Sequence, residues 1–460
     1  MKSLINCFFL IAMLFVLQSL VAQNAKVDGY KGIWYTLNQV SEYGDKYSGG
    51  LGTYTSNHLP VAIYSPEAGK TFFVYGGTPH ADQKQLMVMI SYFDHKTGLM
   101  PKPVVVYSRK GVDDPHDNGS ISIDEDGYIW VFASGRNVTR LGVIFKSTKP
   151  YSIESFEKVH ETVMTYPQPW WFMGKGFIYL FTKYTAPETR GRELYWATSA
   201  DGKNWTEDQK LSGISGHYQL SAVHGNKLVT VFNYHPQGSA DTRTNIYLAQ
   251  TSDMGKTWQT VDNKNIELPL TDPKSSTLVY DFESEGKLVY LNDLSFDADG
   301  NPVIVAVVSK HYQPGPKGDP REWKTFHWKN NRWHINTVCE STHNYDMGSI
   351  YINGKTWLIV GPTASGPQKW GTGGEMVLWK SKNNGRIWKQ VRMLTKNSER
   401  NHSYARRPLN AHKEFYAFWA DGNADEFSVS KLYFTNKKGD KVWQMPYNME
   451  SEFAKPIRLK

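Results

Sequence analysis

The chain has 460 residues, enough for two or three domains or for one large repeated all-β fold. Aromatic residues make up 14% of it, 38 Gly and 22 Pro interrupt it, and no stretch at helical spacing predicts a long helix. This composition excludes coiled coils, helical bundles and disordered chains, and the net charge of +8 favours an anionic partner.

The N-terminal segment has the features of a secretory signal peptide. Lys2 precedes an apolar run from Leu4 to Val21, and small residues follow it near Ala22. No Lys/Arg cluster comes after the run, which favours a cleaved signal over a membrane anchor, and no later stretch is apolar enough to span a bilayer. We therefore expect a signal peptide over residues 1–22, an exported protein, periplasmic or secreted, and a single domain over residues 23–460.

A repeat runs through the rest of the chain. Seven segments share a polar or His/Tyr-containing start, a strand, a Gly-containing turn and further strands rich in Val, Phe, Tyr or Trp. The starts lie at residues 57–60, 115–118, 166–169, 216–219, 279–282, 344–347 and 404–407. Their spacing of roughly 50 to 65 residues suits a four-stranded blade with loops. We predict an all-β fold, a seven-bladed β-propeller, with residues 32–35 closing the ring against the last blade.

Three of the repeats carry a turn of the form Ser/Thr-x-Asp/Asn-x-Gly-x-x-Trp. Thr251–Trp258 fits the pattern fully, Ser381–Trp388 fits it with Asn, and Ser199–Trp205 is one residue short. These turns match the Asp-box hairpins of sialidase-like propellers, in which the Asp or Asn side chain bonds turn amides and Gly takes a positive φ. We predict a structural role for them rather than a catalytic one.

The inner strand of each propeller blade begins near the central channel, so the seven starts are expected to meet at one mouth. Polar groups there either line a functional pocket or satisfy the backbone and water of the channel. The candidate residues at these starts are His58, His116, Gln168, His217, Tyr218, Tyr280, Asp281, Tyr345, Asp346, Tyr404, Arg406 and Arg407.

Two hydrolytic chemistries fit the chain poorly. A sialidase takes the first Arg of its carboxylate-binding triad from an N-terminal motif, whereas the first Arg in this chain is Arg109. A glycosidase needs two carboxylates at the pocket, and the candidates Asp281 and Asp346 have no obvious acid/base partner.

His, Tyr and Arg fit an elimination at a uronic acid better. Removal of H5 needs a cation on the carboxylate and a neutral His or Tyr as base, and a second group then protonates O4. We predict His116 as base, Tyr184 as acid or base, and Arg192 or its neighbour Arg190 on the carboxylate. The alternative for Tyr184 and Arg192 is strand-end packing and a surface ion pair.

Several segments then resemble one family, the BNR-repeat propellers. These are residues 30–35, 46–50, 72–77, 114–118 and 191–195, and the Asp-Pro-His-Asp-Asn segment at 114–118 is the most specific of them. The family includes the ulvan lyases of polysaccharide lyase families 24 and 25, a related ulvan oligosaccharide dehydratase that acts on uronic acids, and an L-rhamnosidase. The resemblance implies a seven-bladed fold and activity on ulvan, an anionic sulfated polysaccharide or its oligosaccharides, with no nucleic acid or membrane partner.

Carried over by position, His116 matches the catalytic His of this family, Arg192 its carboxylate-neutralising Arg, and Tyr184 its catalytic Tyr. The lyases have a second His downstream of the first, and the corresponding place here reads Ser134-Gly-Arg-Asn137. This departure favours the dehydratase, which expels hydroxide from a non-reducing-end uronate, and Arg136 is predicted to bind a sulfate or carboxylate. The residues predicted to bind substrate are His58, Arg136, Arg190, His217, Tyr218, Tyr345 and Arg406.

The leading hypothesis is therefore a carbon–oxygen eliminase that forms a 4,5-unsaturated uronate, either as a lyase or as a dehydratase. The alternatives are a glycoside hydrolase of the L-rhamnosidase type and a non-catalytic glycan-binding propeller. The chemistry requires no cofactor. A structural zinc ion held by Cys339 and His343, with His311, His402 or His412 brought near, stands against a lone buried cysteine.

Overall fold

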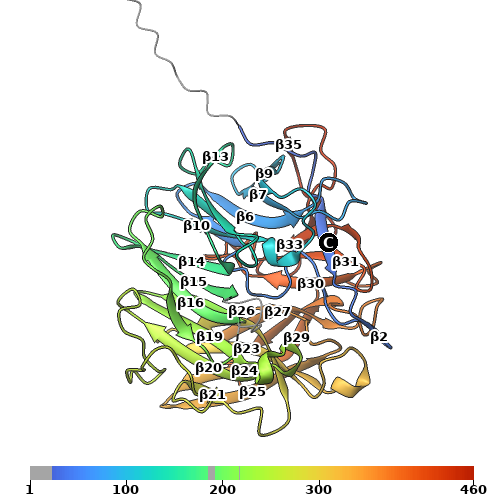
Figure 1. Ribbon diagram of the computed structural model, residues 1–460. Coiled ribbons are helices and arrows are strands. Elements are labelled where there is room, and N and C mark those ends of the chain that lie inside the picture. The colour runs from blue at the N-terminus through green and yellow to red at the C-terminus, as the bar shows by residue number, and fades with distance from the viewer. Residues whose placement is uncertain (1–22, 185–191, 217) are drawn as a thin grey trace, which may run out of the picture.

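The computed structural model describes residues 23–184, 192–216 and 218–460, and these form an all-β propeller (Figure 1). The predicted signal peptide, Arg190 and His217 lie outside the described residues, so the roles assigned to them stay predictions.

Five consecutive sheets have four antiparallel strands each, paired in chain order. Their strands are β10 (Gly119–Ile123), β11 (Ile129–Ala133), β12 (Gly142–Ser147), β13 (Phe156–Thr162), β14 (Thr165–Phe172), β15 (Gly176–Tyr184), β16 (Arg192–Ser199), β17 (Gln209–Ser212), β18 (Gln219–His224), β19 (Lys227–Tyr234), β20 (Thr244–Thr251), β21 (Leu278–Tyr280), β22 (Leu288–Phe296), β23 (Pro302–Ser309), β24 (Arg321–Lys329), β25 (Arg332–Ser341), β26 (Ser349–Asn353), β27 (Thr356–Ala364), β28 (Glu375–Ser381) and β29 (Lys389–Met393).

The N-terminal and C-terminal sheets are larger than these five. The N-terminal sheet contains β1 (Gly32–Thr36), β4 (Ser48–Gly49), β5 (Ala62–Ser65), β6 (Lys70–Gly77), β7 (Met87–Asp94), β9 (Val104–Ser108) and β32 (Ser428–Ser430). The C-terminal sheet contains β30 (Asn401–Arg406), β31 (Ala417–Gly422), β33 (Leu432–Thr435), β34 (Val442–Gln444) and β36 (Ile457–Arg458). Two small ribbons pair β2 (Val40–Ser41) with β3 (Gly44–Asp45) and β8 (Met100–Pro101) with β35 (Phe453–Ala454).

The two ends of the chain are joined by strand pairing. β1 pairs antiparallel with β32, with Ile33 opposite Val429, and Figure 1 shows the blue N-terminal strands beside the red C-terminal ones. The prediction that residues 32–35 close the ring against the C-terminal part of the chain is confirmed. This pairing also covers strand edges that would otherwise expose unpaired backbone groups.

Middle strands of the sheets are apolar on both faces, because neighbouring sheets cover both. All five residues of β11 (Ile-Trp-Val-Phe-Ala) and all eight of β23 are buried. A strand of this kind reads as a continuous apolar run rather than as an alternation. The high aromatic content of the sequence therefore forms packing between sheets, as with Trp130, Trp323 and Trp357, all almost fully buried.

All three Asp-box turns form as predicted. In the first, Asp201 Oδ1 accepts hydrogen bonds from the amides of Lys203 (2.9 Å) and Asn204 (2.8 Å). In the second, Asp253 Oδ1 accepts from Thr257 N at 2.9 Å, and in the third Asn383 Oδ1 accepts from Ile387 N at 2.9 Å. The glycines Gly202, Gly255 and Gly385 all have positive φ.

Gly202 is an Asp-box position where a side chain is expected to be costly. Its φ is +72°, and a Cβ added there would lie 2.3 Å from Cη2 of Trp130. Gly202→Ala is expected to lower the free energy of unfolding by about 2 to 4 kcal/mol, from left-handed strain plus overpacking. Gly174→Ala is the matched control, since its φ is +69° with open space around it. Equal losses for both in chemical denaturation would contradict the role assigned to the Trp130 contact.

One predicted repeat start is wrong. Residues 279–282 lie at β21, the outer strand of its sheet, and the inner strand of the next sheet begins at Leu288. Tyr280 hydrogen-bonds Glu285 at 2.6 Å on the outer side, and Asp281 is exposed. Neither residue belongs to the central mouth.

The axis of the propeller is filled by residues 51–58, which precede β5 and are all buried. Ser56 Oγ donates to Leu291 O (2.8 Å), and Gln168 Nε2 donates to Asn57 O (2.9 Å). Tyr404 OH donates to Tyr54 O at 2.7 Å. Because this segment bonds inner strands of several sheets, the predicted mouth has a floor made of protein.

Candidate functional site

His116 is held in place by the carboxylate two residues before it. The 3-10 helix η1 (Pro115–Asp117) is capped by Asp114, whose Oδ1 accepts from His116 N at 3.0 Å and also bonds Nδ1 of the His116 ring. A carboxylate partner requires the proton on Nδ1, which leaves the lone pair on Nε2 for a substrate. The arrangement is that of an oriented general base.

The surroundings of His116 favour its neutral form. Burial lowers the pKa of His116 below its ordinary value, against the attraction of Asp114, and the charges of Arg136 and Arg192 act in the same direction as burial. His116 is therefore a neutral imidazole at neutral pH.

An ion-pair network fixes the loop that carries Asp114. Asp114 Oδ2 pairs with the guanidinium groups of Arg136 and Arg140, and Arg140 Nε bonds Asp117 Oδ1 at 3.0 Å. Arg109 pairs with Asp117 at 2.5 Å. Burial would raise the pKa of Asp114, but His116 and Arg136 hold that pKa below its usual range, so Asp114 is a carboxylate. Both carboxylates of the Asp-Pro-His-Asp segment are thus engaged by arginines.

Tyr184 and Arg192 lie opposite each other on the adjacent strands β15 and β16. The guanidinium carbon of Arg192 lies 5.0 Å from the centre of the Tyr184 ring. The Tyr184 hydroxyl is buried, and the side chain of Arg136 is its polar neighbour. Burial raises the pKa of Tyr184 above its ordinary value, with Arg192 and Arg136 opposing, so Tyr184 stays protonated at neutral pH. Tyr184 ends β15 and Arg192 begins β16, so the alternative of strand-end packing stays open for both residues.

Aromatic rings connect His116 to the rest of the mouth. Tyr54 stacks on the His116 ring with centroids 4.7 Å apart, and the ring of Tyr166 in β14 lies 5.5 Å from that of His116. Tyr218 lies 5.9 Å from Tyr54 and 6.0 Å from Tyr166. Burial raises the pKa of Tyr166 well above its ordinary value, with Tyr218, Tyr184 and Arg192 as electrostatic neighbours.

A buried cation completes this cluster. Arg243 precedes β20, and its Nη2 donates to Tyr345 OH at 2.6 Å and to Tyr47 OH at 3.3 Å. Its guanidinium carbon lies 4.4 Å from the Tyr218 ring centre and 4.5 Å from that of Tyr290. Such a cage of tyrosines keeps a guanidinium charged without a carboxylate. Arg243 was not among the predicted residues, because it lies outside every repeat start.

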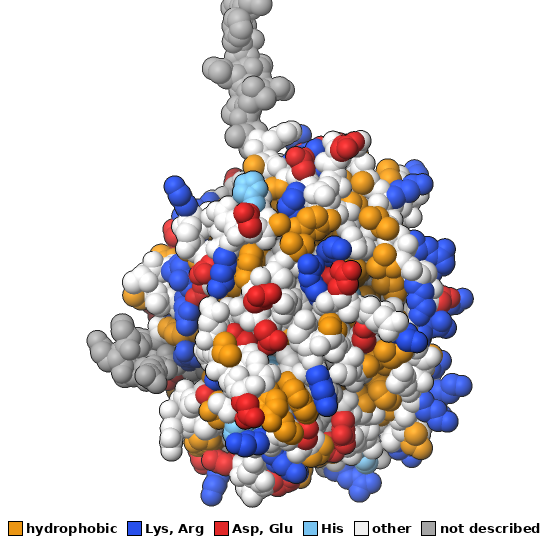
Figure 2. All heavy atoms as spheres, turned by 90° about the vertical axis from the view of Figure 1, so that its right-hand side faces the viewer, with side chains coloured by type: hydrophobic (Ala, Val, Ile, Leu, Met, Phe, Trp, Pro, Cys, Tyr) orange, Lys and Arg blue, Asp and Glu red, His pale blue; other side chains and the backbone are white. Residues whose placement is uncertain are grey.

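The hollow beside His116 has a volume of about 300 Å³. Its wall includes Asp114, His116, Arg136 and Lys84, together with residues 36–39 at the end of β1 and just after it. Asp113 also lines it; Lys84 pairs with Asp113 at 3.6 Å, and Arg136 pairs with Asp114. Elsewhere, Lys and Arg side chains spread around the face drawn in Figure 2 and alternate with Asp and Glu.

The other described residues that were predicted to bind substrate do not line the hollow beside His116. His58 is fully buried, and its Nε2 lies 3.1 Å from the backbone oxygen of His116; burial lowers the pKa of His58 to about 3. Tyr218 and Tyr345 form part of the cage around Arg243. Arg406 is buried and lines a separate cavity of about 190 Å³, which shares no residue with the hollow beside His116.

Four further residues from the repeat starts form hydrogen bonds or ion pairs within the fold. Gln168 and Tyr404 bond the axial segment 51–58. Arg407 pairs with Asp293 at 3.2 Å. Asp346 accepts from the amides of Gly373 (2.7 Å) and His343 (2.8 Å), and burial raises the pKa of Asp346 to about 7.

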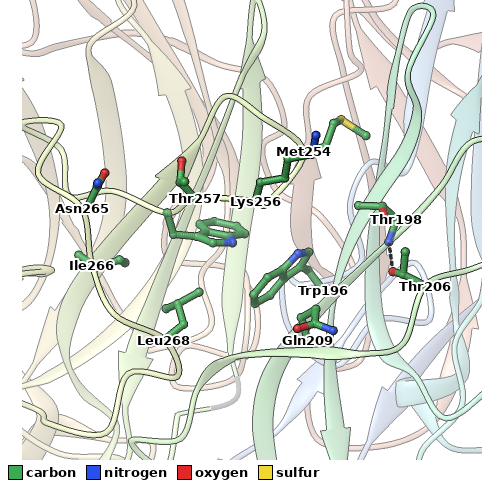
Figure 3. A pocket seen from close by; sticks show the side chains of 12 residues that line it. Trp196, Thr198, Thr206, Gln209, Met254, Lys256, Thr257, Asn265, Ile266 and Leu268 are labelled. Carbon is green, nitrogen blue, oxygen red and sulfur yellow. Dashed lines mark hydrogen bonds between the residues drawn. The ribbon is translucent and has the colours of Figure 1, made fainter.

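A larger hollow, of about 590 Å³, lies beside the Asp box of the sheet that contains β20 (Figure 3). Trp196 and Thr198 from β16, Gln209 from β17, and Met254, Lys256 and Thr257 of the Asp-box turn border it. Thr198 N donates to Thr206 Oγ1 at 3.0 Å across one side. None of the described residues that line it is a His, Asp, Glu or Tyr, so it lacks an acid/base pair.

The predicted zinc ligands lack a third partner within the part of the chain that the structure describes. Among the described residues, Cys339 and His343 belong to no group of three potential ligand atoms within 4.8 Å of one another. Burial raises the pKa of the Cys339 thiol to about 12, which disfavours the thiolate that zinc requires. Nδ1 of His343 lies 3.2 Å from both Tyr345 N and Thr372 Oγ1. These two residues do not fit a zinc ion.

Comparison with known proteins places the fold among those of polysaccharide-degrading enzymes. The model of a "BNR repeat-containing family member" matches residues 70–341. An ulvan lyase of family 25 from Pseudoalteromonas sp. (strain PLSV) is 22% identical over 326 residues, which cover 60% of this chain and 64% of that protein, less than two thirds of its length.

Two solved structures are similar over most of their length. One is a family 25 ulvan lyase bound to -[GlcA(1-4)Rha3S]-, with a TM-score of 0.70 and 17% identity over 86% of this chain and 95% of the other. The other is the polysaccharide lyase Uly1, with a TM-score of 0.57 and 10% identity over 93% and 100%. Within the described part of the chain, no helix has the length and apolar character needed to cross a membrane.

Proposed function

Because the chain belongs to the BNR repeat-containing family, we propose that it is a carbon–oxygen lyase acting on uronic acid residues of ulvan or its oligosaccharides. The observation that carries the proposal is the state of His116. Asp114 orients its ring, and burial together with the charges of Arg136 and Arg192 lowers its pKa, which favours the neutral form. The similarity to ulvan lyases supports the same reaction class.

The reaction needs two proton transfers: one proton leaves C5, and another is donated to O4. Nε2 of His116 takes H5 of the uronate, and the C5–H electron pair forms the C4=C5 double bond as the C4–O4 bond breaks. Arg192, beside Tyr184, stabilises the negative charge that develops on the carboxylate. The Tyr184 hydroxyl then protonates the leaving O4, because its raised pKa keeps the proton on it at neutral pH.

Arg136 bears on the choice between lyase and dehydratase. It occupies the place where the resembling lyases carry a second His, and it pairs with Asp114 while 37% of its side chain stays exposed. A guanidinium at this position suits the anionic end of a substrate. We therefore favour the dehydratase, in which the leaving group is hydroxide, which departs as water, rather than a sugar.

Mass spectrometry of products from defined ulvan oligosaccharides separates the candidates. A dehydratase product is lighter than its substrate by one water with the chain uncut, whereas a lyase yields two shorter fragments, one of them unsaturated. Hydrolysed fragments, each saturated, would instead support a glycosidase of the L-rhamnosidase type. Unchanged substrate would support a glycan-binding protein and would contradict the proposal.

The pH dependence of the reaction follows from the directions of two pKa shifts. The pKa of His116 is lowered by burial, so the base is lost only as the pH falls below the ordinary histidine value of about 6.5. The pKa of Tyr184 is raised by burial, so the acid is lost only above about pH 10. We expect kcat/KM to decline on the acid side below pH 6.5 and to show no alkaline limb below pH 10. An acid limb centred above pH 6.5 in the measured pH–rate profile would contradict His116 as the base.

Three further features belong to the proposal. The net charge of +8 suits an anionic sulfated substrate. The predicted signal peptide at residues 1–22 would deliver the protein to the periplasm or the medium, where such polymers are met. A ring of seven blades is supported by counting the enlarged N-terminal and C-terminal sheets as one blade each beside the five four-stranded sheets.

A further inference from the structure

Three potential metal ligands meet at the seam between the N-terminal and C-terminal sheets. One ligand atom each from His95, His412 and Glu414 lie within 4.8 Å of one another. The two imidazole centroids are 3.9 Å apart, and Nδ1 of His95 lies 3.8 Å from Oε2 of Glu414. Within the described ranges this is the one group of three such ligands.

The three residues come from opposite ends of the chain. His95 directly follows β7 of the N-terminal sheet, whereas His412 and Glu414 lie in the connection between β30 and β31 of the C-terminal sheet. The backbone already crosses the seam here, because Leu409 N donates to Ala62 O and Tyr64 N donates to Leu409 O, both at 2.9 Å.

The imidazole of His95 is prepared for a ligand. Its side chain is 7% exposed, and Nδ1 is buried without a hydrogen-bond partner among the described residues. Nε2 lies 2.8 Å from Thr71 Oγ1, and when the hydroxyl accepts the Nε2 proton, the lone pair of Nδ1 faces His412 and Glu414. A second hydrogen bond of this type orients most histidines that bind metals.

The ring environment holds both histidines in position. Tyr64 packs against both, with centroids 5.1 Å from His95 and 4.9 Å from His412, and Phe93 lies 5.0 Å from His95. The amide of Glu414 approaches Nδ1 of His412 at 3.3 Å, within a short turn that ends at Phe415. An unpaired buried nitrogen in such a setting costs free energy unless a ligand satisfies it.

We propose that His95, His412 and Glu414 bind one Zn²⁺ ion, or a similar late first-row divalent ion, which clips the first sheet of the propeller to the last. Two imidazoles and one carboxylate are a common zinc ligand set, with water in the fourth position. Ca²⁺ is disfavoured, because it takes about six to eight oxygen ligands.

Access from solvent agrees with this assignment. Glu414 also lines a hollow of about 560 Å³, which gives an ion and its water a path from solvent. The ion would stabilise the closed propeller, because it joins residues of the N-terminal and C-terminal sheets that are far apart in sequence.

The test uses the full mature chain freed of metal by a chelator and titrated with ZnCl₂ or CaCl₂ in a calorimeter. We expect one equivalent of Zn²⁺ to bind, no matching signal from Ca²⁺, and a rise in the thermal unfolding midpoint with Zn²⁺. His412→Ala and Glu414→Gln are each expected to weaken Zn²⁺ binding at least about tenfold and to remove the midpoint shift.

Controls keep the outcome decisive. His80→Ala alters an exposed histidine outside this group and is expected to leave binding unchanged. Since the side chain of His95 is only 7% exposed and its loss can disturb folding, the test uses His412 and the exposed Glu414. No equimolar binding by the wild type, or equal affinity in His412→Ala, would overturn the assignment. Neither result depends on the proposed lyase activity.

Discussion

His116→Ala is expected to lower kcat for uronate elimination by about a hundredfold to ten-thousandfold, the usual contribution of a general base. The reason is specific to the geometry. Asp114 holds Nδ1, so Nε2 is the nitrogen that can take H5, and no other described histidine lines the hollow beside Asp114. Initial rates with a uronate-terminated ulvan oligosaccharide measure the effect.

The fold is expected to survive this substitution, which the near-ultraviolet circular dichroism of the many Trp and Tyr residues would report. His224→Ala is the matched control, because His224 is an exposed histidine at the end of β18 and does not line the hollow. Activity retained in a folded His116→Ala protein would show that the base is another residue.

Tyr184→Phe is expected to lower kcat over a similar range, about a hundredfold to ten-thousandfold, by removing the proton that O4 receives. The substitution deletes one oxygen atom beside Arg136 and keeps the buried ring, so the loss to stability should be small. The effect should be smaller on a substrate with a good leaving group at C4, since such a group departs without protonation.

Tyr195→Phe is the control for this prediction. Tyr195 lies on the neighbouring strand β16, and its hydroxyl bonds Glu193 at 3.2 Å. An equal loss of rate in both variants would indicate a general effect of hydroxyl removal on this sheet. A loss that does not depend on the leaving group would contradict Tyr184 as the acid.

Local sequence signals predicted the parts of the fold that depend on neighbours in the chain. The Asp boxes are formed by side chains that bond amides two to four residues away, as Asp253 does with Thr257. The pairing of Asp114 with His116 is also local, across one proline. Such contacts are encoded in short patterns, which a repeat search can recognise.

Long-range placement was harder to predict. The start at residues 279–282 is wrong because a long connection after β20 shifts the period of the repeat, so that the pattern falls on an outer strand. Arg406 was expected at the mouth, but β30 begins at Asn401 and Arg406 ends it, which places the side chain at another cavity. A strand start that is displaced by a few residues moves a side chain from one end of the channel toward the other.

Tyr54 and Arg243 had no signal in the sequence. Tyr54 belongs to the axial segment 51–58 but lies ahead of the repeat start at residues 57–60, and it reaches His116 only through the fold. Arg243 is surrounded by tyrosines from four separate parts of the chain. Their roles depend on which distant rings pack together, which no spacing within one repeat can indicate.

The central claim is that His116 removes H5 of a uronate to form an unsaturated sugar. Its most direct test is the ultraviolet absorbance of the conjugated C4=C5 double bond during incubation with uronate-terminated ulvan oligosaccharides. We predict a steady rise with the wild-type protein and a rise at least about a hundredfold slower with His116→Ala. No rise with the wild type, or an equal rise with the variant, would contradict the claim.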